Sequence, residues 1–366
     1  MNRKNTYLMV KQLLGGTLSL GLALQPALVG AHEGEPDQPV GHAAKALQLS
    51  GDNPITFGAG LTMVGQGMSG NSDDSGFTYS ADLAFTGDFG PRGTAFIYIN
   101  TAQGTGIDTG AATGSNADNE TGDLSAEGYS ETRIAEAWYE LPLNEMASVR
   151  FGKIDPTGIY DGNMVANDET SQFLADTFVN NAAIAFPGYT GGINLAVNPN
   201  EAWSINVGVF ESSGDFDGSL SNSFIIGEVG FAGELAGRPG HLRFTGWSED
   251  STKNKGYALS VDQTVSDSIT LFARYGNQDD EQNFDNAFSL GGQLALGGNT
   301  VGAAYSLLTT TDLAGPDDES QIELYYNHAV NENLHVTLDL QSISNPGFDS
   351  SNDDVFVYGV RGQIDF

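Results

Sequence analysis

The chain has 366 residues, of which 14 are Lys or Arg and 47 are Asp or Glu, so its formal charge is −33. It has no cysteine, which excludes disulfide scaffolds, thiolate metal sites and a cysteine nucleophile. Its acidity disfavours nucleic acid and anionic lipid headgroups as main partners, because like charges repel. The 13 Tyr and 20 Phe are too many for a disordered acidic chain, so the composition predicts a folded protein.

The N-terminus has the three parts of an export signal. Three basic side chains lie within the first eleven residues, an apolar stretch follows over 13–31, and it ends in the small residues Val-Gly-Ala. We therefore predict a cleavable signal peptide over 1–31. A transmembrane anchor is the alternative, which the acidic sequence after residue 31 disfavours. Residues 32–53 are expected to form a periplasmic segment, with a short helix over 42–49 as one option.

From residue 54 to residue 366, sixteen segments of about ten residues alternate apolar and polar side chains, as half-buried strands do. Near the C-terminus, Phe356, Tyr358 and Val360 would face one way, and Arg361 and Gln363 the other. The predicted strands span 54–68, 77–88, 93–104, 132–143, 147–155, 189–199, 203–212, 223–234, 240–250, 255–265, 269–280, 285–297, 299–310, 320–331, 334–346 and 354–366.

Short and long connections alternate strictly between these segments, and the longest include 105–131 and 156–188. Short periplasmic turns, long outer loops and an even strand number are typical of outer-membrane barrels. We therefore predict an all-β fold, a sixteen-stranded antiparallel transmembrane β-barrel over 54–366, in the bacterial outer membrane. Its lumen would be too wide for side chains to fill. A soluble β-sandwich or a β-solenoid is the alternative, and the lack of a fixed short repeat disfavours the solenoid.

The longest connection, 156–188, combines apolar and polar residues in a way that is unusual for an outer loop. The acidic and amide residues at 167–169 suit a helix N-terminus, and three apolar residues would follow on one helical side. We expect this third loop to fold into the barrel, carry a short helix and narrow the pore; a lid that only packs is the alternative. Its polar candidates for the constriction are Tyr160, Asp161, Asn163, Asn167, Asp168, Glu169, Asn180 and Asn181.

Charged and aromatic residues within the predicted strands supply further candidates for the pore lining. A cation facing lipid near the bilayer midplane would cost about 2–4 kcal/mol, so scarce mid-strand cations are expected to face the lumen. The alternatives are salt bridges that only brace the wall and, for the tryptophans, positions in an interfacial girdle. The strand candidates are Arg133, Glu136, Trp138, Arg150, Lys153, Asp155, Arg243, Trp247 and Arg274.

Several stretches resemble the carbohydrate-selective outer-membrane porins, the OprB-like family. The stretches are TRIAEAWYELPL, VRFGKID, ANDETSQFLADTFVNN, QSISNP and DVFVYGVRGQIDF, and the resemblance covers most of the chain from about residue 50. It implies a sixteen-stranded porin that passes small neutral sugars by facilitated diffusion without energy coupling.

The sequence has no common hydrolase, nucleotide-binding or zinc-protease motif, so no enzyme activity, cofactor or metal is predicted. Outer-membrane lipid and small neutral sugars are the expected partners, and a homo-oligomer is one option. Two other functions stay open. One is a general diffusion porin that prefers cations, since the acidic loops would concentrate them at the mouth. The other is an acidic outer-membrane protein that serves in binding or adhesion and has no open pore.

Overall fold

The computed structural model describes residues 47–48, 54–70, 74–115, 131–212, 222–279, 284–310 and 315–366. The predicted signal peptide over 1–31 and most of the segment over 32–53 lie outside these residues. Of the optional helix over 42–49, only Leu47 and Gln48 are described. They form the two-residue strand β1, which pairs with β2, so the chain is extended at these two positions.

The structure confirms the sixteen predicted strands, and no strand end differs from the prediction by more than three residues. The strands are β2 (Ile55–Ser69), β3 (Asp74–Asp88), β4 (Thr94–Thr105), β5 (Glu131–Asn144), β6 (Ala147–Ile154), β7 (Thr190–Asn200), β8 (Trp203–Glu211), β9 (Ser223–Leu235), β10 (Arg238–Glu249), β11 (Lys255–Thr264), β12 (Ile269–Gln278), β13 (Phe284–Leu296), β14 (Asn299–Thr310), β15 (Glu319–Ala329), β16 (Leu334–Ser344) and β17 (Val355–Asp365).

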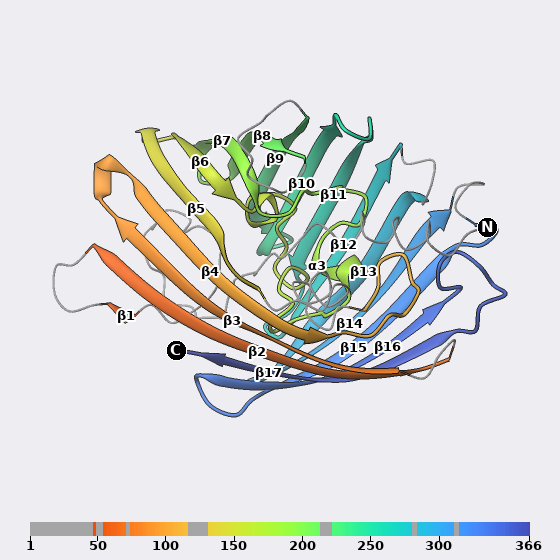
Figure 1. The fold of residues 1–366 in the computed structure, drawn as a ribbon. Coiled ribbons are helices and arrows are strands. Elements are labelled where there is room, and N and C mark those ends of the chain that lie inside the picture. The colour runs from red at the N-terminus through yellow and green to blue at the C-terminus, as the bar shows by residue number, and fades with distance from the viewer. Residues whose placement is uncertain are drawn as a thin grey trace.

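The strands from β2 to β17 form one closed antiparallel ring (Figure 1). Each strand pairs with its sequence neighbours, and β17 pairs with β2 from Phe356 opposite Ser69 to Asp365 opposite Gly60. Beyond the end of β17, β1 pairs with Thr56 and Phe57 of β2. Closure leaves no long unpaired sheet edge, which apolar surroundings would penalise. Among the described residues, no helix has the length and hydropathy to cross a bilayer.

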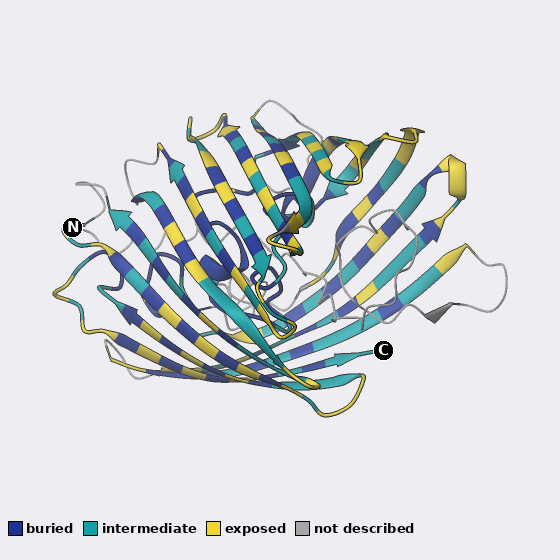
Figure 2. Cartoon of the chain, turned by 180° about the vertical axis from the view of Figure 1, so that it is seen from behind, coloured by how far each residue is buried: buried dark blue, intermediate teal, exposed yellow. Residues whose placement is uncertain are grey.

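The two faces of the sheet differ in polarity because buried and exposed residues alternate along each strand, as the bands in Figure 2 show. On β17, Phe356, Tyr358 and Val360 are exposed on the outer face, whereas Val357 and Arg361 are buried on the inner face. The predicted alternation of β17 is therefore confirmed. The outer face is largely apolar, and the inner face carries most of the polar and charged side chains.

The connection between β6 and β7, called here segment 155–189, contains the 3-10 turn η2 (Pro156–Gly158) and the helix α3 (Asp176–Val179). The helix expected to begin at 167–169 is wrong in position. Asp168 accepts hydrogen bonds from Thr170 and Ser171 and closes a single turn instead. Arg361 binds the carbonyl oxygens of residues 169 and 172, which a helix would use for its own backbone hydrogen bonds.

Candidate functional site

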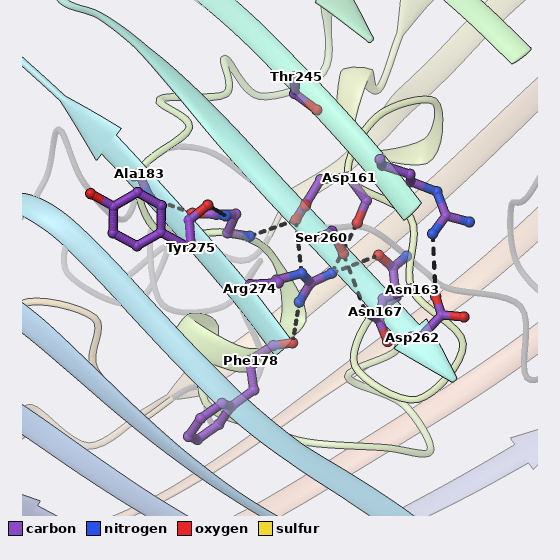
Figure 3. A network of polar contacts seen from close by, with 12 residues as sticks. Asp161, Asn163, Asn167, Phe178, Ala183, Thr245, Ser260, Asp262, Arg274 and Tyr275 are labelled. Carbon is purple, nitrogen blue, oxygen red and sulfur yellow. Dashed lines mark hydrogen bonds and ion pairs between the residues drawn. The ribbon is translucent and has the colours of Figure 1, made fainter. Parts of the chain in front are cut away.

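Segment 155–189 is held by side chains on the inner faces of β9–β12, β15 and β17. At the β12 side, Arg274 and Asp161 form a fully buried ion pair with Nε and Oδ2 3.2 Å apart (Figure 3). The same guanidinium donates to the carbonyl oxygens of Phe178 at 2.8 Å and of Asp161 at 2.9 Å. Arg274 therefore ties together two stretches of the segment that lie seventeen residues apart in sequence.

Asp161 is fixed through its backbone and its side chain. Its φ of 58° lies in the left-handed region, which is uncommon outside glycine but tolerated by aspartate. Its amide donates to Glu228 Oε2 on β9 at 2.8 Å, and its carboxylate accepts from the amide of Asn181 at 2.6 Å. Burial raises the pKa of Asp161, while the guanidinium of Arg274 and the amide of Asn181 act in the opposite direction.

The segment is attached to β10 and β12 at a second place. Trp247 Nε1 donates to the carbonyl oxygen of Ala183 at 3.0 Å, and Asn181 Nδ2 donates to that of Tyr275 at 3.1 Å. Near the start of the segment, Tyr160 donates to Asn194 Oδ1 on β7 at 2.5 Å. Burial raises the pKa of the Tyr160 hydroxyl, which therefore stays a neutral donor.

On β15 and β17 the segment is bound through its backbone. The two carboxylate oxygens of Glu323 accept the amides of Leu174 and Ala175 at 2.6 and 2.9 Å. Arg361 donates to the carbonyl oxygens of Glu169 and Gln172. Charge-assisted hydrogen bonds of this kind are stronger than neutral ones, so both side chains fix the course of the segment.

An aromatic cluster lies beside these polar contacts. The ring of Phe173 packs edge-on against Tyr325 at a centroid distance of 4.9 Å, and against Phe178 and Phe272 at 5.3 and 5.9 Å. Leu174 packs against Val64 on β2. The apolar residues that the sequence singled out in 156–188 therefore pack against the barrel wall.

A second connection also reaches the inner face. Residues 106–115 follow β4, and the Ala112 amide donates to both carboxylate oxygens of Glu319 on β15 at 2.9 Å. Glu319 also accepts the Gly347 amide at 2.7 Å, and Ser115 accepts a hydrogen bond from Gln66 on β2 at 2.9 Å. Glu319 thus joins two connections, those after β4 and β16.

A third group lies on β4–β6, toward the short turns. The Arg150 guanidinium lies over the Trp138 ring, 4.0 Å from its centroid, and binds Glu140 Oε2 at 2.8 Å through Nε and Nη2. Trp138 stacks on Phe96 with a centroid distance of 5.0 Å and donates to Glu136 Oε2 at 3.1 Å. The side chain of Arg150 keeps 13% of its surface exposed.

Arg243 on β10 forms a fourth group. Its Nη1 donates to Asp262 Oδ2 at 3.2 Å, and His241 Nδ1 lies 2.5 Å from Asp262 Oδ1. The Met164 amide, in segment 155–189, donates to Asp262 Oδ2 at 3.3 Å. Asp262 is fully buried, whereas the side chains of His241 and Arg243 keep 25% and 20% of their surface exposed.

Most of the predicted site residues lie on the inner face or in segment 155–189. Arg133 packs over the Tyr189 ring at 5.1 Å, Asn163 donates to Ser260 at 3.3 Å, and the Asp155 carboxylate accepts from Thr157 at the start of η2. Trp138 and Trp247 are buried inside, so the interfacial girdle is excluded for both. Asn167 accepts a long hydrogen bond from Arg274 at 3.5 Å.

Lys153 is the exception, and its assignment to the pore lining is wrong. Its neighbours in register are Ala137 and Gly191, and it shares a face with the exposed Phe151. It lies three positions after Arg150, and an odd separation along a strand puts two side chains on opposite faces. Its Nζ donates to the carbonyl oxygen of Ile134 at 2.9 Å, beside a bulge in β5.

The sequence-based candidates omit several residues that hold the site together. Glu228 could have been found by the argument used for the arginines, because an acidic side chain in mid-strand is also costly in lipid. Gln172, which accepts from two backbone amides of its own segment, gives no such signal. Within the described ranges no three His, Asp or Glu side chains are placed to hold a metal ion.

A family model described as the carbohydrate-selective porin, OprB family, matches residues 66–252 and 244–366. The chain belongs to this family. An uncharacterised protein of Aquifex aeolicus (strain VF5) is 30% identical over 212 residues, which are 57% of this chain and 63% of that relative.

Solved porin structures share the fold. The high-pH structure of Pseudomonas putida OprB has a TM-score of 0.70 at 17% identity, over 86% of this chain and 95% of that one. Its low-pH structure has a TM-score of 0.59 over 86% and 93% of the two chains, also at 17% identity. A mutant of the Rh. blastica porin has a TM-score of 0.53 at 17% identity, over 85% and 100%. Family and fold point to a channel and not to an enzyme.

Proposed function

We propose that this protein is an outer-membrane porin through which small carbohydrates diffuse passively, and that residues 156–188 form its constriction. The proposed constriction is supported by two contacts between segment 155–189 and the barrel wall. Asp161 binds Glu228 on β9, and Leu174 packs against Val64 on β2. These strands lie on nearly opposite sides of the sixteen-stranded ring. A segment that contacts the inner faces of both β2 and β9 has to cross the lumen.

The polarity of the two faces supports a membrane-spanning barrel with a wet interior. Large apolar side chains, among them Ile322, Leu338 and Val360, are exposed on the outer face, where acyl chains would cover them. The inner face presents hydroxyl, amide and charged groups, which suit a solute rich in hydroxyls. Membrane lipid and neutral sugars are therefore the partners that we propose.

The test is liposome swelling with the mature protein, after heat-modifiable gel migration has established that it is folded. Liposomes in xylose, glucose or sucrose should swell at rates that fall with sugar size, and raffinose should enter slowest. Protein-free liposomes are the control. Folded protein that leaves all rates at the control level would overturn the porin proposal.

The charge of −33 favours a second candidate, a general porin that prefers cations. The two candidate functions differ in whether the pore binds sugars while they pass through it. A general porin would pass a sugar and a non-sugar polyol of equal size alike, and its current would not respond to glucose. A carbohydrate porin should show current noise or block that saturates with glucose concentration, because a site is being filled.

A further inference from the structure

Three inner-face arginines that lie near segment 155–189 differ in how many of their donors the protein uses. Arg274 donates to two backbone carbonyls and pairs with Asp161, and Arg361 donates to three oxygen atoms. Arg243 makes one hydrogen bond, from Nη1 to Asp262, within the part of the chain that the structure describes. Its Nε and Nη2 have no hydrogen-bond partner there.

A glycine of segment 155–189 lies over the face of this guanidinium. A Cβ atom added to Gly162 would lie 3.7 Å from Arg243 Nε and 3.8 Å from both Cζ and Nη2, which places it above the plane of the guanidinium beside its free edge. The segment therefore passes over Arg243 at the one residue type that has no side chain to cover it. A second glycine, Gly230 on β9, gives room to the aliphatic part of the Arg243 side chain and to Ser204 Oγ.

Asp262 fixes the orientation of the Arg243 guanidinium. Asp262 is fully buried and accepts from His241, from the Met164 amide and from Arg243 itself. Both carboxylate oxygens of Asp262 therefore have partners. The group that is left to bind a ligand is the partly exposed guanidinium of Arg243, which can only donate hydrogen bonds. A planar guanidinium with two free N–H positions on one edge matches two adjacent oxygen atoms.

The surrounding charges indicate which oxygen atoms would bind. Around Arg243 and Arg274 lie three carboxyl groups, those of Asp161, Glu228 and Asp262, so the site has no surplus of positive charge. The chain as a whole is strongly acidic, which disfavours entry of anions. Neutral hydroxyl oxygens fit this site better than a carboxylate does.

We propose that the free edge of Arg243, oriented by Asp262 and with Gly162 over its face, binds adjacent hydroxyl groups of a neutral sugar in the pore. This inference rests on the proposed sugar-porin function. Arg243 is thereby a specificity-determining residue, whereas Arg274 and Arg361 are structural. The hydrogen bonds are few and partly exposed, so the site would release the sugar readily, as transport requires.

The experiment measures block of single-channel current by glucose in planar bilayers, with Arg243→Gln and Gly162→Ala as variants. Gly162→Ala places a methyl group at ordinary contact distance from the guanidinium and should fold. Gly246→Ala is the matched control, because an added Cβ at Gly246 on the outer face of β10 meets no atom within 4 Å. Heat-modifiable migration establishes folding of each variant.

Arg243→Gln should raise the half-blocking glucose concentration about three- to tenfold, as the loss of one or two hydrogen bonds predicts. Gly162→Ala adds a methyl group beside the free edge and should raise it less, and Gly246→Ala should leave it unchanged. Unchanged block in folded Arg243→Gln would overturn the site and leave the porin function intact. Absence of glucose block in the wild type would instead count against the proposed function itself. Stronger block by glucuronate than by glucose would overturn the neutral-sugar assignment.

Discussion

Arg274 and Arg361, on β12 and β17, differ from Arg150 and Arg243, on β6 and β10, although all four lie on the same face of the sheet. The first two are completely buried and donate to the backbone of segment 155–189. The other two are held by carboxylates and stay partly exposed. What decides the role of each arginine is whether it donates to backbone carbonyl oxygens of the segment.

The difference separates two parts of the inner wall. On β12 and β15–β17, buried charges fix the course of the segment, and they would be costly to leave without partners. On β5, β6 and β10, charged groups remain accessible and can meet a solute. Changes in the first part should therefore lower stability, and changes in the second should alter selectivity.

The largest effect is expected from Arg361→Met. The substitution removes the donors to the carbonyls of Glu169 and Gln172 and leaves Asp339 buried without its nearby positive charge. Breaking a buried charged network by removing one member typically costs about 3–5 kcal/mol. The free energy of unfolding, measured by urea titration of the reconstituted protein, should fall by that amount.

The control for this prediction is Arg238→Met, at an exposed ion pair with Asp267 between two short turns. Exposed pairs contribute about 0–1 kcal/mol, so this variant should unfold close to the wild type. Equal losses of unfolding free energy in Arg361→Met and Arg238→Met would show that hydrogen bonds to the backbone of segment 155–189 do not make Arg361 more important for stability than an exposed arginine.

A smaller effect is expected from Glu319→Gln. An amide retains one acceptor oxygen and puts an NH₂ group where the Ala112 and Gly347 amides now point. An unsatisfied buried donor costs about 1–3 kcal/mol. Residues 106–115 should loosen, which protease susceptibility of that stretch would detect, while Glu234→Gln at an exposed site on β9 should not change it. Unchanged susceptibility in Glu319→Gln would show that the carboxylate does not hold the loop.

The faces of the strands follow from sequence because period two is local. Phe356, Tyr358 and Arg361 fall on the predicted sides of β17 without knowledge of any long-range contact. The role of a buried charge does not follow in this way. Arg274 bonds to the backbone of residues 161 and 178, about a hundred positions away, and no local pattern specifies that pairing.

The two wrong predictions have causes of different kinds. The helix expected at 167–169 depends on carbonyl groups that Arg361 binds, so a residue nearly two hundred positions away overrides the local signal. The error at Lys153 could have been avoided from the sequence, because its separation from Arg150 is odd. The position of Gly162 over the face of Arg243 could not be predicted, because only the fold brings the two residues close.

The smallest effects should come from the pair Arg150 and Lys153, which tests the face assignment directly. Arg150→Met removes an accessible cation from the inner face and leaves Glu140 without its partner. The ratio of K⁺ to Cl⁻ permeability, from reversal potentials at about 0.1 M salt, should rise about two- to threefold and less at 1 M, where screening is stronger. Lys153→Met removes the same charge from the outer face and should leave the ratio unchanged, because that side of β6 faces away from the lumen. If both substitutions shift the ratio equally, Lys153 faces the lumen and the register of β6 with β5 and β7 is wrong.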